Sequence, residues 1–111
     1  MTANTFRRMA LALPEALEAS HMGHPDFRVR GKIFATLWPG DEFGMVKLNP
    51  EQQTFFVIAN PKVFQPVQGA WGTRGCTRVR LRPAKTGALR DALAAAWRNT
   101  APKRLVQQLE V

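Results

Sequence analysis

The sequence predicts an α+β fold, a two-layer sandwich in which helices cover one face of an antiparallel β-sheet. In residues 27–48, FRVRGKIFATLWPGDEFGMVKL, apolar and polar residues alternate, and the alternation breaks at 30–31 and again at 39–42. This pattern predicts three strands joined by two turns, which are too short for the crossovers of a parallel sheet. Helical periodicity lies on both sides of this stretch, so we expect helices to cover one face of the sheet.

Charge is the most unusual bulk property of the chain. The 111 residues hold 16 Lys and Arg against 8 Asp and Glu, a formal net charge of +8 with a pI near 11.1. This excess favours polyanionic partners, although many small basic proteins bind nucleic acid only nonspecifically. The length suits one domain over residues 1–111, and no apolar run is long enough to cross a bilayer, so we expect no membrane partner and a cytoplasmic location.

The first elements are a helix and an edge strand. Thr2 or Asn4 is placed to cap a helix in which apolar residues recur at helical spacing, and Pro14 ends it. The first residues of the chain, MTANTFRRMALALP, are more typical of a first helix than of a secretory leader. Residues 16–22 alternate weakly, which predicts the edge or entry strand of the sheet.

After the central strands, Asn49, Pro50 and Gln52 predict a helix start with a cap, a first-turn proline and a capping box. The helix ends near residue 60, although FFVIA alone would also suit a strand. Residues 63–68 predict a short strand that Pro66 restricts to an edge or a bulge. Residues 69–75 contain three glycines around Trp71 and predict a loop.

The clearest strand is residues 76–82, where arginine alternates with apolar residues, so that one face is apolar and the other is arginine. Thr86 is placed to cap the next helix, which has a broad apolar stripe and runs to Thr100. A final short helix follows the break at 101–102.

Strand alternation predicts the content of the uncovered sheet face. Ile33, Ala35 and Leu37 are expected to point into the core, and Thr36 is expected to point away from it. The predicted nucleic-acid contacts are Arg28, Arg30, Lys32, Lys47, Arg74, Arg78, Arg80 and Arg82. The predicted stacking or pocket residues are Phe34, Trp38 and Trp71.

Cations interleaved with aromatic rings suit a phosphate backbone and unstacked bases. Three alternatives stay open. In the first, the arginines form a solvated outer face that binds nothing. In the second, Phe34 or Trp38 packs under a loop or under the last helix, and in the third, a bulge at Gly31 breaks the alternation. Trp71 either closes the end of the sheet or lines a ligand site, and Arg74 is either an anion contact or a solvated tip.

Other chemistry has little support in the sequence. His21 and His24 are three residues apart, which on a strand or turn does not complete a metal site, so we expect structural or surface histidines and no metal. Cys76 is expected to be a partly buried structural thiol. Nucleotide-binding glycine motifs and a nucleophile elbow are absent from the sequence. We therefore expect a protein without cofactor or enzymatic activity.

Several segments together resemble the MmcQ/YjbR family over nearly the whole chain. They are, in order, Leu13-Pro14-Glu15, residues 24–29 (HPDFRV), residues 31–35 (GKIFA), Val46-Lys47-Leu48 with Pro50-Glu51, and a Gly/Trp loop before a strand and a long helix. The resemblance implies a CyaY-like α+β sandwich and the double-wing DNA-binding role proposed for family members. It implies no catalytic residues, and residues 69–72 depart from the family pattern.

Two functions follow as hypotheses. The first is a non-enzymatic domain that binds nucleic acid, in the first instance DNA, through the cationic sheet face. The second is a binding module for an anionic small molecule or an acidic protein, with a cleft near Trp38 and Trp71 and a rim of arginines.

Overall fold

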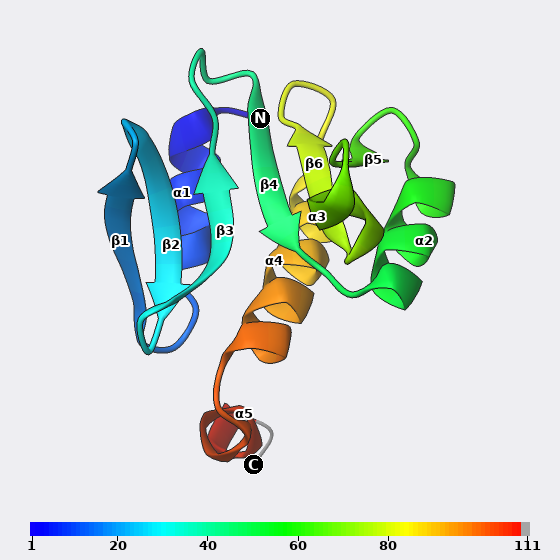
Figure 1. Ribbon diagram of the computed structural model, residues 1–111. Coiled ribbons are helices and arrows are strands. Elements are labelled where there is room, and N and C mark those ends of the chain that lie inside the picture. Colours follow the sequence, from blue (N-terminus) through cyan, green and yellow to red (C-terminus); the bar gives the residue numbers. More distant parts are fainter. Residues whose placement is uncertain (110–111) are drawn as a thin grey trace.

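An antiparallel sheet of six strands, in the order β1-β2-β3-β4-β6-β5, runs through the protein, and the computed structural model describes residues 1–109 (Figure 1). The strands are β1 (Ala16–His21), β2 (His24–Val29), β3 (Lys32–Leu37), β4 (Phe43–Lys47), β5 (Phe64–Pro66) and β6 (Cys76–Arg80). The helices are α1 (Ala3–Leu11), α2 (Pro50–Ala59), α3 (Ala70–Thr73), α4 (Thr86–Thr100) and α5 (Lys103–Leu109). The predicted α+β architecture with an antiparallel sheet is confirmed.

Helices α1 and α4 cover one face of the sheet, where α4 contacts β3 and β4 and α1 contacts β1 and α4. The large side chains between the two layers are fully buried, and Phe6, Phe27 and Trp97 are among them. The other face carries no long helix, and we call it the open face. Helix α2 packs beside β5 at one end of the sheet, and the short α3 lies against β6 (Figure 1).

The helix starts agree with the sequence at two of three predicted positions. Thr2 caps α1 and accepts a hydrogen bond from the Thr5 amide at 3.1 Å. Asn49 and Gln52 form the predicted capping box of α2, with both reciprocal hydrogen bonds present. The prediction for Thr86 is wrong, because Lys85 occupies the cap position of α4 and Thr86 is already helical.

The last strands are also shorter than predicted. β5 is an edge strand of three residues, as Pro66 requires, and β1 forms the other edge. β6 ends at Arg80, so Arg82 lies beyond the strand. Residues 69–75 are not a plain loop, because α3 forms a helical turn within them.

A bulge in β3 overturns part of the predicted alternation. Phe27 pairs with Ala35 and Arg28 pairs with Ile33, so Phe34 is an extra residue without a partner across the strand pair. Phe34 and Ala35 are therefore both fully buried, and Ile33 turns to the open face. The prediction that Phe34 is an exposed stacking residue is wrong, and so is the inward placement of Ile33. The alternative of a bulge at Gly31 was left open in the sequence, and the bulge lies three residues later, at Phe34.

Candidate functional site

Strand register sets which side chains share the open face. Asp26 of β2 pairs with Thr36 of β3, Thr36 pairs with Met45 of β4, and Met45 pairs with Arg78 of β6. Directly paired residues project to the same side of a sheet, so these four form a row across the open face, which Gln65 of β5 completes. The row runs across five of the six strands.

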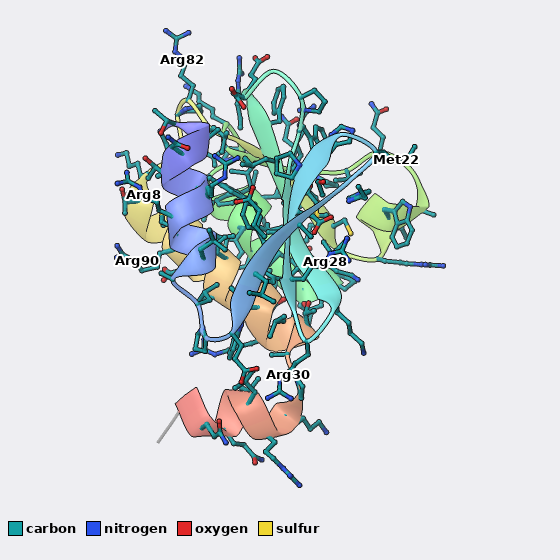
Figure 2. The ribbon with its side chains drawn as sticks, turned by 90° about the vertical axis from the view of Figure 1, so that its left-hand side faces the viewer. Arg8, Met22, Arg28, Arg30, Arg82 and Arg90 are labelled. Atoms are coloured by element: carbon teal, nitrogen blue, oxygen red, sulfur yellow. The ribbon has the colours of Figure 1, made fainter. Side chains whose placement is uncertain are left out.

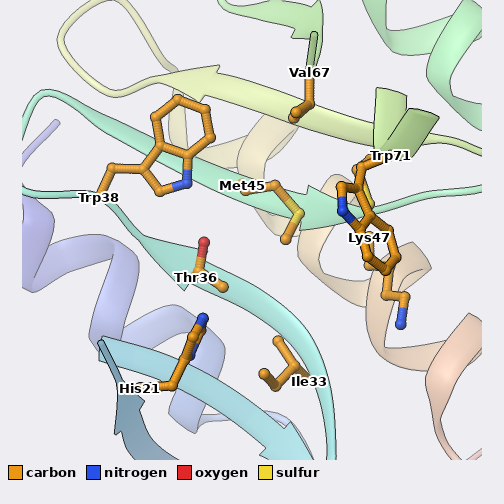
Figure 3. A pocket seen from close by; sticks show the side chains of 9 residues that line it. His21, Ile33, Thr36, Trp38, Met45, Lys47, Val67 and Trp71 are labelled. Atoms are coloured by element: carbon orange, nitrogen blue, oxygen red, sulfur yellow. The ribbon is translucent and has the colours of Figure 1, made fainter. Parts of the chain in front are cut away.

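A pocket of about 310 Å³ lies beside this row, and we call it the open-face pocket (Figure 3). Its wall is mostly apolar, and it brings together side chains from both halves of the chain. The lining residues are His21, Ile33, Thr36, Trp38, Met45, Lys47, Val67, Trp71 and Cys76. Figure 3 shows Trp38 at one end, Trp71 at the other and Met45 between them. Two residues predicted for stacking, Trp38 and Trp71, thus belong to one pocket.

The Trp38 end of the pocket is fixed by contacts between aromatic and cationic groups. The Trp38 and Phe43 ring centroids are 6.1 Å apart, and the guanidinium of Arg78 lies 4.6 Å from the centre of the Phe43 ring. Arg78 also donates a hydrogen bond to the side chain of Gln65. Arg78 is therefore held in place, with its charge close to the aromatic wall.

The Trp71 end is more open. α3 carries Trp71, whose exposed fraction is 59%, and Arg74 lies over the Trp71 ring at 5.4 Å. Cys76 also lines the pocket, and burial raises the pKa of its thiol above the ordinary value. The thiol is therefore protonated at neutral pH and forms part of the apolar wall, as expected of a structural cysteine.

A buried carboxylate organises the His21 side of the pocket. Asp26 is fully buried and accepts hydrogen bonds from Arg28 Nε at 2.7 Å and Arg28 Nη2 at 3.0 Å. The His21 Nδ1 atom lies 2.7 Å from the other Asp26 oxygen, Oδ2, which Nη2 shares. The Arg28 hydrogen bonds hold the pKa of Asp26 below its ordinary range, and Asp26 in turn raises the pKa of Arg28. Asp26 is thus ionised and fully satisfied at neutral pH.

Replacing Asp26 by asparagine is expected to lower the free energy of unfolding by about 3 kcal/mol at neutral pH, because one charge of a buried, hydrogen-bonded pair is removed. The folded-state pKa lies below the unfolded value, so this stabilisation is present above about pH 4 and is lost as the pH falls through the folded pKa. Urea unfolding of both proteins across an acid pH series measures it.

Asp91→Asn is the matched control, because Asp91 is exposed on α4 and its replacement should cost less than about 0.5 kcal/mol. Equal stability of Asp26→Asn and Asp91→Asn at neutral pH would contradict the role given to Asp26.

The predicted cations do not form one continuous open surface. Arg28 is paired with Asp26, and Arg30 donates two hydrogen bonds to Glu15, at 2.6 and 3.0 Å. Figure 2 shows Arg82 at the top of the view and Arg30 far below it, beside α5. Lys32 pairs with the buried Val29, which directs it to the helix-covered side at the sheet border.

The remaining predicted cations lie around the open face. Lys47 lines the pocket and is exposed, Arg74 stands over Trp71, and Arg78 is held against Phe43. Arg80 pairs with Phe43 and is exposed at the end of β6. The structure thus brings four of the eight predicted cations to the surroundings of the pocket.

Sequence reasoning missed His21, Asp26 and Thr36 as a group. The His21-x-x-His24 spacing indicated a metal site or structural or surface histidines, and the second interpretation was preferred without a role in a pocket. Within residues 1–109 the structure holds no group of three or more His, Cys, Asp or Glu side chains that could bind a metal ion. The signal was the alternation of β1, which places His21 on the same side as Ala19, the partner of Asp26. This signal groups His21 with Asp26 only when it is known which residues of β1 and β2 pair.

The family model described as YjbR matches residues 11–99. The chain belongs to the YjbR family. The match covers every strand, the pocket and most of α4, and it confirms the resemblance seen in the sequence.

This YjbR domain also resembles a solved structure, the Deinococcus radiodurans protein DR2400 with its DUF419 domain. The TM-score is 0.74 at 17% sequence identity, and the alignment covers 99% of this chain and 88% of the other. At this identity the likeness shows the fold alone. A search of the curated proteins found no match to this chain. No helix within residues 1–109 is long and apolar enough to cross a membrane.

Proposed function

We propose that this YjbR domain binds single-stranded nucleic acid, DNA in the first instance, across the open face of its sheet. The observation that carries the proposal is the open-face pocket, which has a tryptophan at each end and cations at its border. Aromatic side chains stack on bases that are not paired, and lysine and arginine neutralise the phosphates on either side. The bases of an intact duplex are stacked inside the helix and do not reach such a pocket.

The size and charge of the site support this proposal. A volume of about 310 Å³ suits one ring system rather than a segment of duplex. Lys47 and Arg74 lie at the Trp71 end, and Arg80 pairs with Phe43, whose ring lies against Trp38, so cations stand toward both ends of the pocket. The net charge of +8 attracts a polyanion from a distance.

Fluorescence anisotropy with a labelled oligothymidylate, across a salt series, tests the proposal. We expect binding that weakens with salt. The slope of log K against log salt is negative, and its magnitude should fall by about 0.7 for each phosphate contact removed. The double variant Lys47→Ala/Arg80→Ala should show this decrease. Trp71→Ala should weaken binding by about 2 kcal/mol through lost stacking.

The control is Arg8→Ala/Arg90→Ala, which changes the net charge equally but alters exposed arginines of α1 and α4, on the far side from Arg28 (Figure 2). Equal weakening by the two double variants would mean that binding follows net charge alone and does not use the open face. An absence of binding at low salt would refute the proposal outright.

A second candidate is a small anionic ligand with an apolar body, because the pocket combines a mostly apolar wall with the cation of Lys47. Tryptophan fluorescence distinguishes the two. A mononucleotide or another small anion that shifts the emission, without competition from the oligonucleotide, supports the small ligand. Competition for one site, with tighter binding of the longer chain, supports single-stranded nucleic acid.

A further inference from the structure

His21 presents one defined nitrogen to the open-face pocket. Asp26 is an ionised carboxylate that only accepts hydrogen bonds, so the His21 Nδ1 atom at 2.7 Å from it must carry the proton. In the neutral imidazole, Nε2 is then an acceptor with a free lone pair. Because Asp26 is fully buried and fixed by two hydrogen bonds from Arg28, the orientation of the His21 ring is fixed as well.

A second polar group lies on the same wall. Thr36 lines the pocket with an exposed fraction of only 7%, and its hydroxyl makes no side-chain hydrogen bond within residues 1–109. No buried side-chain nitrogen or oxygen in this range lacks a partner, so the Thr36 hydroxyl reaches the surface of the pocket. Figure 3 shows the tip of the His21 ring and the Thr36 hydroxyl on one side of the pocket, with Ile33 beside them. The His21 Nε2 atom and the Thr36 hydroxyl thus lie side by side on a wall that is mostly apolar. A ligand that hydrogen-bonds to both satisfies groups that an apolar ligand would leave unpaired.

We propose that His21 and Thr36 read the hydrogen-bonding edge of one unstacked base in the open-face pocket. His21 Nε2 accepts a hydrogen bond from a base N–H, and the Thr36 hydroxyl donates to the neighbouring carbonyl oxygen or ring nitrogen. Trp38 and Trp71 supply stacking, which every base offers alike, whereas these two groups require a base with polar atoms at its edge. This inference rests on the proposed binding of single-stranded nucleic acid.

The test compares oligothymidylate with an oligonucleotide of the same length in which difluorotoluene, an isostere of thymine that does not form strong hydrogen bonds, replaces the bases. We expect the wild-type protein to bind oligothymidylate about tenfold more tightly, the effect of two neutral hydrogen bonds. His21→Ala and Thr36→Val should each reduce this ratio to about threefold, because each removes one of the two.

His24→Ala is the matched control. His24 pairs with His21 at the same hairpin and has a ring centroid 6.2 Å from that of His21, but it does not line the pocket. The tenfold ratio should therefore survive in this variant. His21 is 45% exposed in its side chain and Val suits a strand as well as Thr, so both test variants should fold.

Nitrogen-15 NMR of the imidazole gives a readout without ligand. In the neutral imidazole of His21 we expect the proton on Nδ1 and none on Nε2, and the opposite tautomer would overturn the inference. A wild-type protein that binds both oligonucleotides equally, with binding still dependent on Trp71, overturns the base reading while the proposed function stands. If neither oligonucleotide binds, both proposals fail.

Discussion

Replacing Trp97 by alanine is expected to lower the free energy of unfolding by about 4 kcal/mol, a large share of the roughly 5–15 kcal/mol typical of a domain. Trp97 is fully buried between α4 and the sheet. Its indole N–H donates a hydrogen bond to the Pro14 carbonyl at 2.9 Å, which ties α4 to the segment after α1. Urea denaturation followed by circular dichroism measures the loss.

Trp97→Phe separates the two contributions, since it keeps a buried ring but loses the hydrogen bond to Pro14. This variant should cost about 2 kcal/mol, from an unpaired carbonyl and a small cavity. If Trp97→Ala costs no more than Trp97→Phe, then the packing assigned to the indole ring is incorrect.

Replacing Gly72 by alanine is expected to disrupt α3 and with it the open-face pocket. A Cβ atom at Gly72 would lie 1.6 Å from the Val67 carbonyl oxygen and 2.7 Å from its carbon, so the backbone must shift. Overpacking of this kind costs about 3 kcal/mol. Because Val67 and Trp71 both line the pocket, binding of oligothymidylate should fall even in the fraction that remains folded.

Gly87→Ala is the control for this substitution. Gly87 lies in α4, and nothing is within 4 Å of a Cβ built there, so alanine should stabilise the protein by up to about 1 kcal/mol through its helix propensity. The two variants, compared by urea unfolding and by anisotropy, distinguish a local clash from a general effect of losing glycine. A Gly72→Ala protein with unchanged stability and binding would contradict the close contact with Val67.

Local chemistry made much of the fold predictable. Turn residues, strand alternation and the Asn49 capping box each act over a few neighbouring positions, and the structure has strands and a helix where they indicate. The alternation failed at one place, Phe34, because the bulge depends on how β3 pairs with β2 and not on β3 itself. One extra residue then moved Lys32, Ile33 and Phe34 each to the face opposite the one that alternation predicts.

The site was less predictable than the fold, because it depends on pairings between distant residues. Alternation correctly placed Arg28 on the open face, but only the fold shows that the buried Asp26 holds it. Glu15 is fifteen positions from Arg30, and that ion pair forms only when the start of β1 reaches the β2–β3 turn. Trp38 and Trp71 were both singled out in the sequence, but their joint pocket requires β3 and α3 to meet across β4.

The order of the strands divides the sheet into two halves. In the local half, paired strands follow one another directly in the chain, and in the nonlocal half they are far apart in the sequence. β1 to β4 follow one another through short turns, whereas β4 pairs with β6 only across the chain that forms α2, β5 and α3. Closing that longer loop costs conformational entropy before its contacts form. The pocket takes Ile33 and Thr36 from the local half and Val67 and Trp71 from the nonlocal half. The pocket therefore exists only in molecules that have completed the β4–β6 pairing. Separation of β4 from β6 alone would abolish the pocket while β1 to β4 remained paired with one another.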